Sequence, residues 1–281
     1  MKHIPVLLNS VLDALGNIAG KTVVDCTFGA GGYSRAFLRA GANVIAFDRD
    51  SNVVADADAI KAEFGDRFHF IPKTFSHICE LGCVVDAIVF DLGISSMQID
   101  VPERGFSFRF DAPLDMRMSD NGLTAAQLIE RLSVSELSDI FRTYGDVKKA
   151  NVLASAIKQA LPQTTFELRD LIYNPNDIAP VFQALRIAVN DEMGELERAL
   201  ASVPELLCVG GKCVCVTFHS LEDRIVKNTF RTWTTPLGDP RMPVLKPAPF
   251  ELIRSQTPTD DELEYNSRAR SAHMRGVIKK E

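Results

Sequence analysis

Four short apolar runs, separated by helix-like stretches, constrain the fold of this chain more than any other feature. The runs are TVVDCT (22–27), NVIAFD (43–48), FHFIP (68–72) and VDAIVFD (85–91). Their length and nearly continuous hydrophobicity are typical of parallel strands buried on both faces. The intervening stretches, such as SRAFLRAG, have the length and spacing of helices. The alternation predicts right-handed βαβ units and a doubly wound parallel sheet.

The pattern changes in the middle of the chain. Residues 112–207 are predicted to form successive helices without a strand, and the last is expected to be one long helix with an apolar stripe. We interpret this stripe as ordinary core packing. Its members are Phe182, Leu185, Val189, Met193, Leu196 and Leu200.

Strand character returns after the helical block. KCVCVTF (212–218) is followed by a predicted helix over 220–233, a Pro-rich connection and two further strand candidates, FELIR and MRGVIKK. We therefore expect an α/β fold in which a Rossmann-like sheet is interrupted by an inserted all-helical domain. The expected boundaries are 1–111 and 208–281 for the two parts of the sheet domain and 112–207 for the insertion.

Composition excludes several classes of protein. With 46% hydrophobic and 24% charged residues, the chain is too apolar for disorder. Asp86 and Asp91 interrupt its most apolar region, so no stretch approaches the ~20 apolar residues of a membrane span, and we expect a cytoplasmic protein without a membrane partner. The six cysteines include no C-x-x-C pair. Small buried thiols are therefore favoured over ligands, and no metal site is expected.

The first strand candidate runs into a glycine-rich turn, DCTFGAGGYS. Glycines at this point let the backbone turn tightly and let a ligand approach the positive end of the following helix. The second strand ends at Asp48, 23 residues after Asp25, where a carboxylate accepts hydrogen bonds from a ribose diol. A simple strand–helix turn with a capping Asp is the alternative. The combination favours a nucleoside cofactor.

Details of the turn distinguish between two such cofactors. Ser34 occupies the slot of the third glycine of the dinucleotide fingerprint, and Asp25 would repel a pyrophosphate. A sulfonium or an ammonium tolerates that carboxylate. The turn thus favours S-adenosylmethionine, and an NAD-dependent oxidoreductase is the alternative enzyme class.

Two later strands also end in polar residues. Asp91 follows the run AIVF, and His219 follows the strand KCVCVTF, at an edge where such sheets place their chemistry. Asp91 as a strand-end cap and Ser220 as a helix cap are the structural alternatives. The segment ERGFSFRFDAPLDMRM is either a salt-bridged surface or a loop that closes over a flat base. A serine hydrolase has little support, because there is no G-x-S-x-G elbow.

Eight segments together resemble, in order and spacing, the signature motifs of the RsmH (MraW) family of bacterial 16S ribosomal RNA cytosine N4-methyltransferases. The resemblance extends from His3 to about Arg275, over nearly the whole chain. It implies a Rossmann-like, S-adenosylmethionine-dependent methyltransferase domain with an inserted helical domain that helps to recognise RNA. The segments are HIPVLLNSVL, DCTFGAGGYS, DLGISSMQID, ERGFSF, PLDMRM, FQALRIAVNDE, FHSLEDRIVK and NSRARSA.

The resemblance also implies the residues that bind the cofactor. The family usually has His where this chain has Tyr33, and the segment NSRARSA keeps both arginines of the family motif but lacks its proline. Carried over position by position, the contacts are Gly31, Gly32, Tyr33, Asp48, Phe75, Asp91 and Gln98.

The implied reaction is methylation of the exocyclic N4 of a cytosine in the decoding centre of 16S rRNA. The implied substrate is 16S rRNA within the small ribosomal subunit, and the implied enzyme is a monomer or a homodimer. A catalyst must splay the base from its stack and accept a hydrogen bond from its amino group, for which Asp91 is the candidate. His219 or Asp223 would make a second polar contact, and Phe106 or Phe108 would stack on the base. Candidate phosphate contacts are Arg224, Arg268 and Arg270.

The distribution of charge bears on this substrate. The net charge of −6 divides into −8 over residues 1–204 and +2 over 205–281, and positions 265–280 hold no acid. Arg224, Lys227 and Arg231 follow one another on a predicted helix. These charges exclude a general nucleic-acid coat protein but suit an enzyme with few phosphate contacts. An RNA-binding protein that has lost catalysis is a further alternative.

Overall fold

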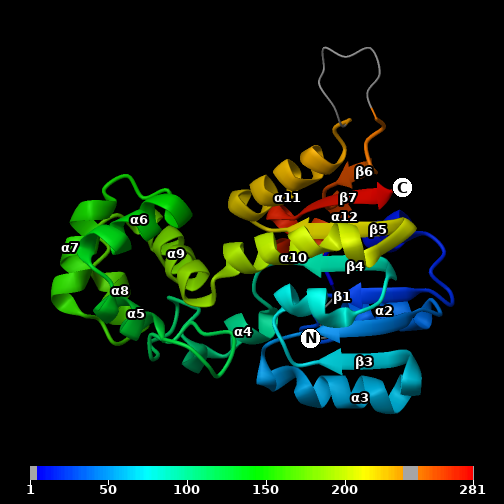
Figure 1. Ribbon diagram of the computed structural model, residues 1–281. Coiled ribbons are helices and arrows are strands. Elements are labelled where there is room, and N and C mark those ends of the chain that lie inside the picture. The colour runs from blue at the N-terminus through cyan, green and yellow to red at the C-terminus, as the bar shows by residue number, and fades with distance from the viewer. Residues whose placement is uncertain (1–4, 237–245, 281) are drawn as a thin grey trace. The chain divides into compact units, whose positions relative to one another are not determined.

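The computed structural model describes residues 5–236 and 246–280 (Figure 1). The chain divides into two compact units, which we call the sheet unit (Met1–Gly93 with Met193–Glu281) and the helical unit (Ile94–Glu192). Two residues of the predicted Pro-rich connection, Pro240 and Pro243, lie outside the described residues. No helix of the described residues is long and apolar enough to cross a membrane.

The sheet unit is built on seven strands, counted over the described residues, in the order β3-β2-β1-β4-β5-β7-β6. The first five are parallel, and all four apolar runs of the first part of the sequence form strands, as expected. The strands are β1 (Thr22–Asp25), β2 (Asn43–Phe47), β3 (Phe68–Ile71), β4 (Val85–Asp91), β5 (Leu207–Thr217), β6 (Phe250–Gln256) and β7 (His273–Lys279).

The last strand of the sequence, β7, departs from the parallel arrangement expected for the first four apolar runs. This strand is antiparallel to both of its neighbours, pairing Gly276 with Val214 of β5 and Val277 with Leu252 of β6. The connection from β6 spans residues 257–272, and the returning chain enters the sheet between β5 and β6 in the opposite direction, so antiparallel ladders form on both sides. Nothing in the apolar pattern of MRGVIKK specifies that direction.

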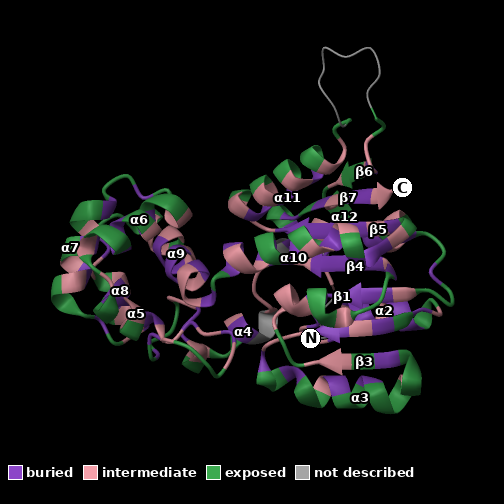
Figure 2. Ribbon diagram, in the orientation of Figure 1, coloured by how far each residue is buried: buried purple, intermediate pink, exposed green. Residues whose placement is uncertain are grey.

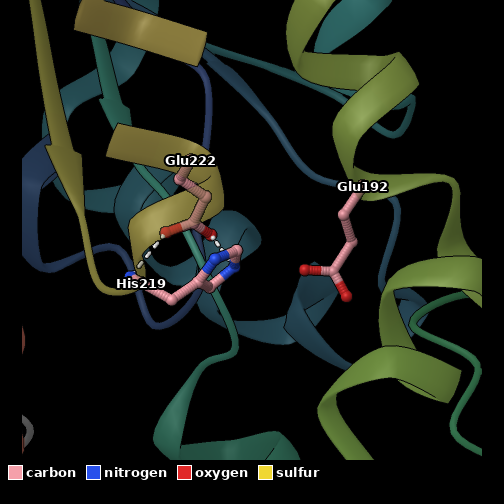
Figure 3. Close-up of side chains that lie close together, drawn as sticks. All are labelled: Glu192, His219 and Glu222. Carbon is pink, nitrogen blue, oxygen red and sulfur yellow. Dashed lines mark hydrogen bonds and ion pairs between the residues drawn. The ribbon is translucent and has the colours of Figure 1, made fainter. Parts of the chain in front are cut away.

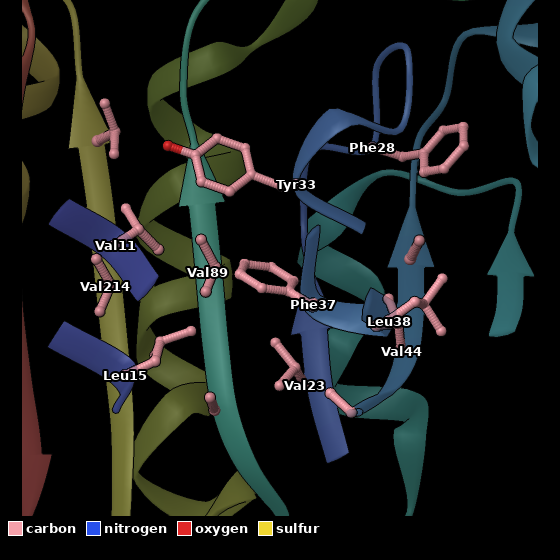
Figure 4. Packing of buried hydrophobic residues seen from close by; sticks show 14 of the residues in the cluster. Val11, Leu15, Val23, Phe28, Tyr33, Phe37, Leu38, Val44, Val89 and Val214 are labelled. Atoms are coloured by element: carbon pink, nitrogen blue, oxygen red, sulfur yellow. The ribbon is translucent and has the colours of Figure 1, made fainter. Parts of the chain in front are cut away.

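Helices cover both faces of the sheet (Figure 1). The buried alternate residues of β1, β2 and β4 pack against α1, α2 and α3 on one face, where Val23, Phe37 and Val89 belong to the same core (Figure 4). On the other face, α10 and α11 supply Leu200 and Phe230 to a second core. The helices are α1 (Leu8–Leu15), α2 (Gly32–Arg39), α3 (Val54–Phe64), α10 (Glu192–Leu206), α11 (Ser220–Trp233) and α12 (Asp260–Tyr265).

Short 3-10 helices occur at several connections of the chain. They are η1 (Ser51–Val53), η2 (Gly65–Arg67), η3 (Phe75–Leu81), η4 (Pro102–Arg104), η5 (Pro175–Asp177) and η6 (Ser267–Ser271).

The helical unit surrounds a core of its own, visible as the buried inner faces of its helices in Figure 2. Capping boxes at Ser95, Thr124, Ser133 and Thr164 begin four of its helices by satisfying free backbone N–H groups. The helices are α4 (Ser96–Asp100), α5 (Ala125–Arg131), α6 (Val134–Gly145), α7 (Ala150–Ala160), α8 (Thr165–Asp170) and α9 (Ile178–Asn190).

The long helix expected around residues 182–200 is instead two helices. Asp191 adopts a left-handed conformation (φ 49°), which ends α9 before α10 begins. Leu185 of α9 belongs to the helical core, whereas Leu200 of α10 belongs to the sheet core. The single apolar stripe therefore serves two different cores.

The chain passes from one unit to the other after Gly93 and after Glu192, whereas the sequence placed these boundaries near 112 and 207. Phe106, Leu114 and Met116 lie before or near the expected boundary but pack in the helical core. On the other side of the insertion, α10 packs on the sheet. The helical composition of a segment indicates its secondary structure but not the core that it joins.

Candidate functional site

Hydrogen bonds tie together the carboxyl ends of four parallel strands. The N–H of Gly29 donates to Oδ2 of Asp48 (2.8 Å), and the N–H of Asp91 donates to Oγ1 of Thr27 (2.7 Å). The N–H of Leu92 donates to the carbonyl of Val216 (2.9 Å). The chain leaves β1 toward β2 on one side and reaches β4 on the other, and sheets of this kind bind ligands at such a switch point.

The glycine turn between β1 and α2 is shaped by its own packing. Gly31 has φ 74°, and a Cβ there would lie 2.4 Å from Cδ1 of Ile60. A Cβ at Gly32 would lie 2.4 Å from Cγ of Pro5. The sequence reasoning gave ligand approach as the reason for these glycines, but close internal contacts already require them.

Three carboxylates end β1, β2 and β4 in different surroundings. Asp25 is fully buried, and burial raises its pKa to about 6 although Oγ of Ser34 donates to its Oδ2 (2.6 Å). Burial also raises the pKa of Asp48, whose two oxygens accept from the N–H groups of Gly29 and Asp50. Ser34, which occupies the position of the fingerprint's third glycine, thus donates a hydrogen bond to Asp25.

Asp91 differs from the other two acids. Burial, followed by the charges of Asp25 and Glu222, raises its pKa well above the ordinary range. Its Oδ1 is buried and accepts no hydrogen bond within the part of the chain that the structure describes. Because a buried acceptor without a partner is costly, this oxygen is suited to a donor or cation supplied by a ligand.

Two aromatic residues of the predicted cofactor site lie near this edge. Tyr33 is buried at the start of α2, and its hydroxyl donates to the carbonyl of Val6. Phe75 is half-buried after β3, with its ring edge-on to Phe90 at a centroid distance of 5.7 Å. Their contacts with a cofactor stay predictions.

His219 is held by a neighbouring carboxylate (Figure 3). Its Nε2 lies 3.0 Å from Oε1 of the buried Glu222, whose other oxygen accepts from the N–H groups of Phe218 (2.8 Å) and His219 (3.3 Å). The helix begins at Ser220 with His219 at its N-cap, so the alternative of Ser220 as the cap is wrong. The glutamate thus holds the backbone of His219 by a hydrogen bond and lies within ion-pair distance of its ring.

Asp223, the other predicted polar contact, is engaged in an ion pair. Arg275 donates to it from Nε (2.7 Å) and Nη2 (2.9 Å), and Thr217 donates from its hydroxyl (3.4 Å). The Arg275 guanidinium keeps the pKa of Asp223 below its ordinary value. This pairing joins α11 to β7 and suits a structural role better than a direct role in catalysis.

The helical unit contains the predicted residues Gln98, Phe106 and Phe108. Oε1 of Gln98 accepts from the N–H of Ser95 in a capping box, and its contact with the cofactor stays a prediction. Phe106 is buried beside the Arg104 guanidinium, and Phe108 lies edge-on to Phe182 at 5.5 Å. Core packing of these two rings leaves little area for stacking on a base. Phe110, 55% exposed, is the most open aromatic ring of this segment.

The structure describes the side chains of two of the three predicted phosphate contacts. Arg224 is exposed on α11, and Arg270 is exposed within η6. The side chain of Arg268 lies outside the described part of the structure. Lys227 and Arg231 are exposed on the same helix as Arg224, one and two turns further on. We call these three α11 residues the basic stripe.

Sequence reasoning missed three residues that organise the site. Thr27 follows β1 and holds the backbone of Asp91, which is 64 positions away. Glu222 holds His219, and Arg275 holds Asp223 from 52 positions away. Only Glu222 carried a signal, because a Glu three residues after a helix start is the capping-box spacing.

Comparisons with known proteins identify relatives of this chain. Residues 1–280 match the MraW methylase family. A protein of Brucella anthropi named ribosomal RNA small subunit methyltransferase H is 43% identical, over 100% of this chain and 88% of its own length. A protein of Rhizobium leguminosarum with the same name is 44% identical, with the same coverage. A crystal structure of an rRNA methylase from Streptococcus thermophilus is 13% identical with a TM-score of 0.46, covering 100% of this chain and 99% of that one.

Proposed function

This chain belongs to the MraW methylase family, and from that premise we propose that it methylates the exocyclic N4 of a cytosine in the decoding centre of 16S rRNA. The names of the curated relatives support small-subunit ribosomal RNA as the substrate. The motif resemblance supports the N4 position. The observation that carries the catalytic part of the proposal is the buried, unpartnered Oδ1 of Asp91 at the switch point of the sheet.

The cofactor is S-adenosylmethionine, which supplies an electrophilic methyl group when bound. The residues at the carboxyl edge fit it, because Asp48 and Asp91 together with the nearby Asp25 favour a sulfonium and an ammonium over a pyrophosphate. Within the sheet unit, the residues that hold it are Gly31, Gly32, Tyr33, Asp48, Phe75 and Asp91.

Asp91 suits the proton chemistry of an exocyclic amine. The N4 lone pair is delocalised into the ring, so the amine is a weak nucleophile. Forming the N–C bond, as the bond from the methyl group to sulfur breaks, converts NH2 to NH–CH3 and releases one proton in all, which a base must accept. Burial makes Asp91 a stronger base than an ordinary carboxylate, and its free Oδ1 accepts that proton. His219, fixed by Glu222, contributes the second polar contact.

The basic stripe supports an RNA substrate. Many other cations of this acidic chain pair with carboxylates, such as Lys73 with Glu80 and Arg142 with Asp139. The three stripe residues have no ion pair within residues 5–236 and 246–280. Phosphates neutralise such unpaired cations, so Arg224, Lys227, Arg231 and the exposed Arg270 are phosphate contacts.

Two measurements test this function. Mass analysis of 16S rRNA from cells with and without the gene should locate a lost methyl group on one cytosine of the decoding centre. Complementation with the wild-type gene should restore it, and complementation with Asp91→Ala should not. A methyl group that is unaffected by the deletion would refute the proposal.

Purified protein separates the cofactor from the catalytic role of Asp91. Calorimetric titration should detect binding of S-adenosylhomocysteine and none of NAD, whereas the reverse result would favour an oxidoreductase. Asp91→Ala should abolish methyl transfer, and its cofactor affinity, measured separately, shows which part of the loss is catalytic. Full transfer by this variant would remove Asp91 from the mechanism.

A further inference from the structure

The chain segment of residues 5–7 lies across the start of α2. Pro5 packs directly on Gly32, so that a Cβ at this glycine would lie 2.4 Å from Cγ of the proline. The carbonyl of Val6 accepts a hydrogen bond from the hydroxyl of Tyr33, and Val6 itself is buried. We call residues 5–7 the strap. It thus touches two consecutive residues of the proposed cofactor site.

A second attachment holds the other end of the strap. The N–H of Leu7 donates to Oε1 of Glu262 on α12 at 2.6 Å. Glu262 is positioned in turn by the N-cap of α12, where its own N–H donates to the hydroxyl of Thr259. The strap is therefore fastened on one side to α2 and on the other to α12.

The backbone of the strap is strained. Leu7 has φ 55° and ψ 24°, a left-handed conformation that is unfavourable for a leucine. It is also almost fully buried. Such a conformation persists only where surrounding contacts impose it, and backbone strain of this kind clusters at ligand clamps. The hydrogen bonds from the Tyr33 hydroxyl to the carbonyl of Val6 and from the N–H of Leu7 to Glu262 hold the peptide group that precedes this conformation.

Tyr33 links the strap to the acids of the carboxyl edge. Burial first, and then the charges of Asp91 and Asp25, raise the pKa of its hydroxyl well above the ordinary value. Figure 4 shows its ring beside the carboxyl end of β4, next to Val89. The same side chain therefore contacts the strap and lies within the electrostatic reach of Asp91.

From this geometry we propose that the strap closes the cofactor's site and that two side chains latch it, Tyr33 from within that site and Glu262 as a positioning residue outside it. This inference rests on the proposed function. A latched strap retains the bound cofactor, so breaking either latch speeds its release and raises the KM for S-adenosylmethionine. In Glu262→Ala the rate at saturating cofactor is unchanged, because Glu262 holds the backbone of Leu7 and is not among the residues that hold the cofactor.

The test compares Tyr33→Phe and Glu262→Ala with two reference variants. Glu262→Gln keeps an oxygen that accepts from Leu7 and should restore most of the affinity. Tyr144→Phe, on α6 of the helical unit, makes the same chemical change away from the strap. Loss of one hydrogen bond predicts about fivefold weaker binding of S-adenosylhomocysteine for each latch variant, mainly through faster dissociation.

Hydrogen–deuterium exchange of residues 5–15 monitors the strap itself. Faster exchange together with the fivefold loss of affinity supports the proposal. Faster exchange with unchanged affinity, or a lower kcat with unchanged KM, overturns it while leaving the methyltransferase function intact. Failure of the wild-type protein to bind S-adenosylhomocysteine instead overturns the proposed function. If Tyr33→Phe does not fold, the comparison of Glu262→Ala with Glu262→Gln decides alone.

Discussion

The side chain of Thr27 accepts a hydrogen bond from the backbone N–H of Asp91 at 2.7 Å. This single bond joins the turn after β1 to the last residue of β4, on either side of the switch point. Thr27, in the glycine turn, thereby positions the backbone of Asp91, the proposed base. The position of Asp91 therefore depends on a hydroxyl that does not itself take part in the reaction.

Thr27→Val should lower both stability and methyl transfer. The substitution keeps the shape but leaves the N–H of Asp91 without its acceptor, at a cost of about 2 kcal/mol. Urea unfolding measures the stability, and initial rates measure the transfer. Thr229→Val on α11 is the matched control, since the Thr229 hydroxyl makes no side-chain hydrogen bond among the described residues. Equal behaviour of the two variants would contradict the prediction.

Asp25→Asn should flatten the pH dependence of stability. In the folded protein burial raises the pKa of Asp25 from 3.8 to about 6, so the folded state binds its proton more tightly than the unfolded state. The contribution of Asp25 to wild-type stability should therefore fall by about 3 kcal/mol as the pH rises through this interval and then stay level.

The Asp25→Asn variant should lack the decrease in stability that comes from Asp25. It should retain the part of the pH dependence that comes from Asp48 and Asp91, whose pKa values are also raised by burial. Fluorescence of Trp233, the single tryptophan, reports urea unfolding of the sheet unit alone because its ring stacks on Phe250. Parallel pH curves for the wild type and the variant would rule out a raised pKa at Asp25.

Asp223 and Arg275 should behave as a coupled structural pair. Each side chain is about one quarter exposed, so removing one partner leaves a partly buried charge and should cost about 1–2 kcal/mol. The double variant Asp223→Asn with Arg275→Met should cost less than the sum of the single variants. Methyl transfer per folded molecule should be nearly unchanged in Asp223→Asn. A large loss of kcat without a loss of stability would instead show that Asp223 acts in catalysis.

Neutralising the basic stripe should weaken RNA binding in a salt-dependent manner. Each of Arg224→Gln, Lys227→Gln and Arg231→Gln should lower the slope of log affinity against log salt concentration by about one. Affinity for S-adenosylhomocysteine should be unaffected. Arg142→Gln, which removes a cation already paired with Asp139, is the control and should leave the slope unchanged. A stripe variant with the wild-type slope would show that its residue meets no phosphate.

The sequence predicted the strands of the sheet better than it predicted the ends of the helices or the cores that they join. The apolar runs that end at Asp25, Asp48 and Asp91 identified three neighbouring strands and the edge where their acids lie, because burial on both faces leaves a continuous apolar pattern. The break at Asp191 was missed, since the apolar spacing continues through it. Local periodicity does not show which of two cores a side chain enters.

The partners of the site residues could not be predicted in the same way. Thr27 with Asp91 and Arg275 with Asp223 are contacts between segments far apart in the chain, and they depend on strand order and register. The contact of Pro5 with Gly32 likewise arises from tertiary packing. A glycine in such a turn is usually explained by the approach of a ligand, whereas Gly32, in the proposed cofactor-binding turn, makes room for Pro5.

The insertion of the helical unit between β4 and β5 has a consequence for how the chain folds. These strands are hydrogen-bonded neighbours, yet residues 92–206 separate them in sequence. Closing so long a loop from a disordered chain is slow, whereas a helical unit with a core of its own and many local contacts forms quickly. Once formed, that unit fixes the separation of its two ends, so less disordered chain remains to be closed when β4 pairs with β5. The helical unit should therefore fold early, and the pairing of β4 with β5 should limit the overall rate.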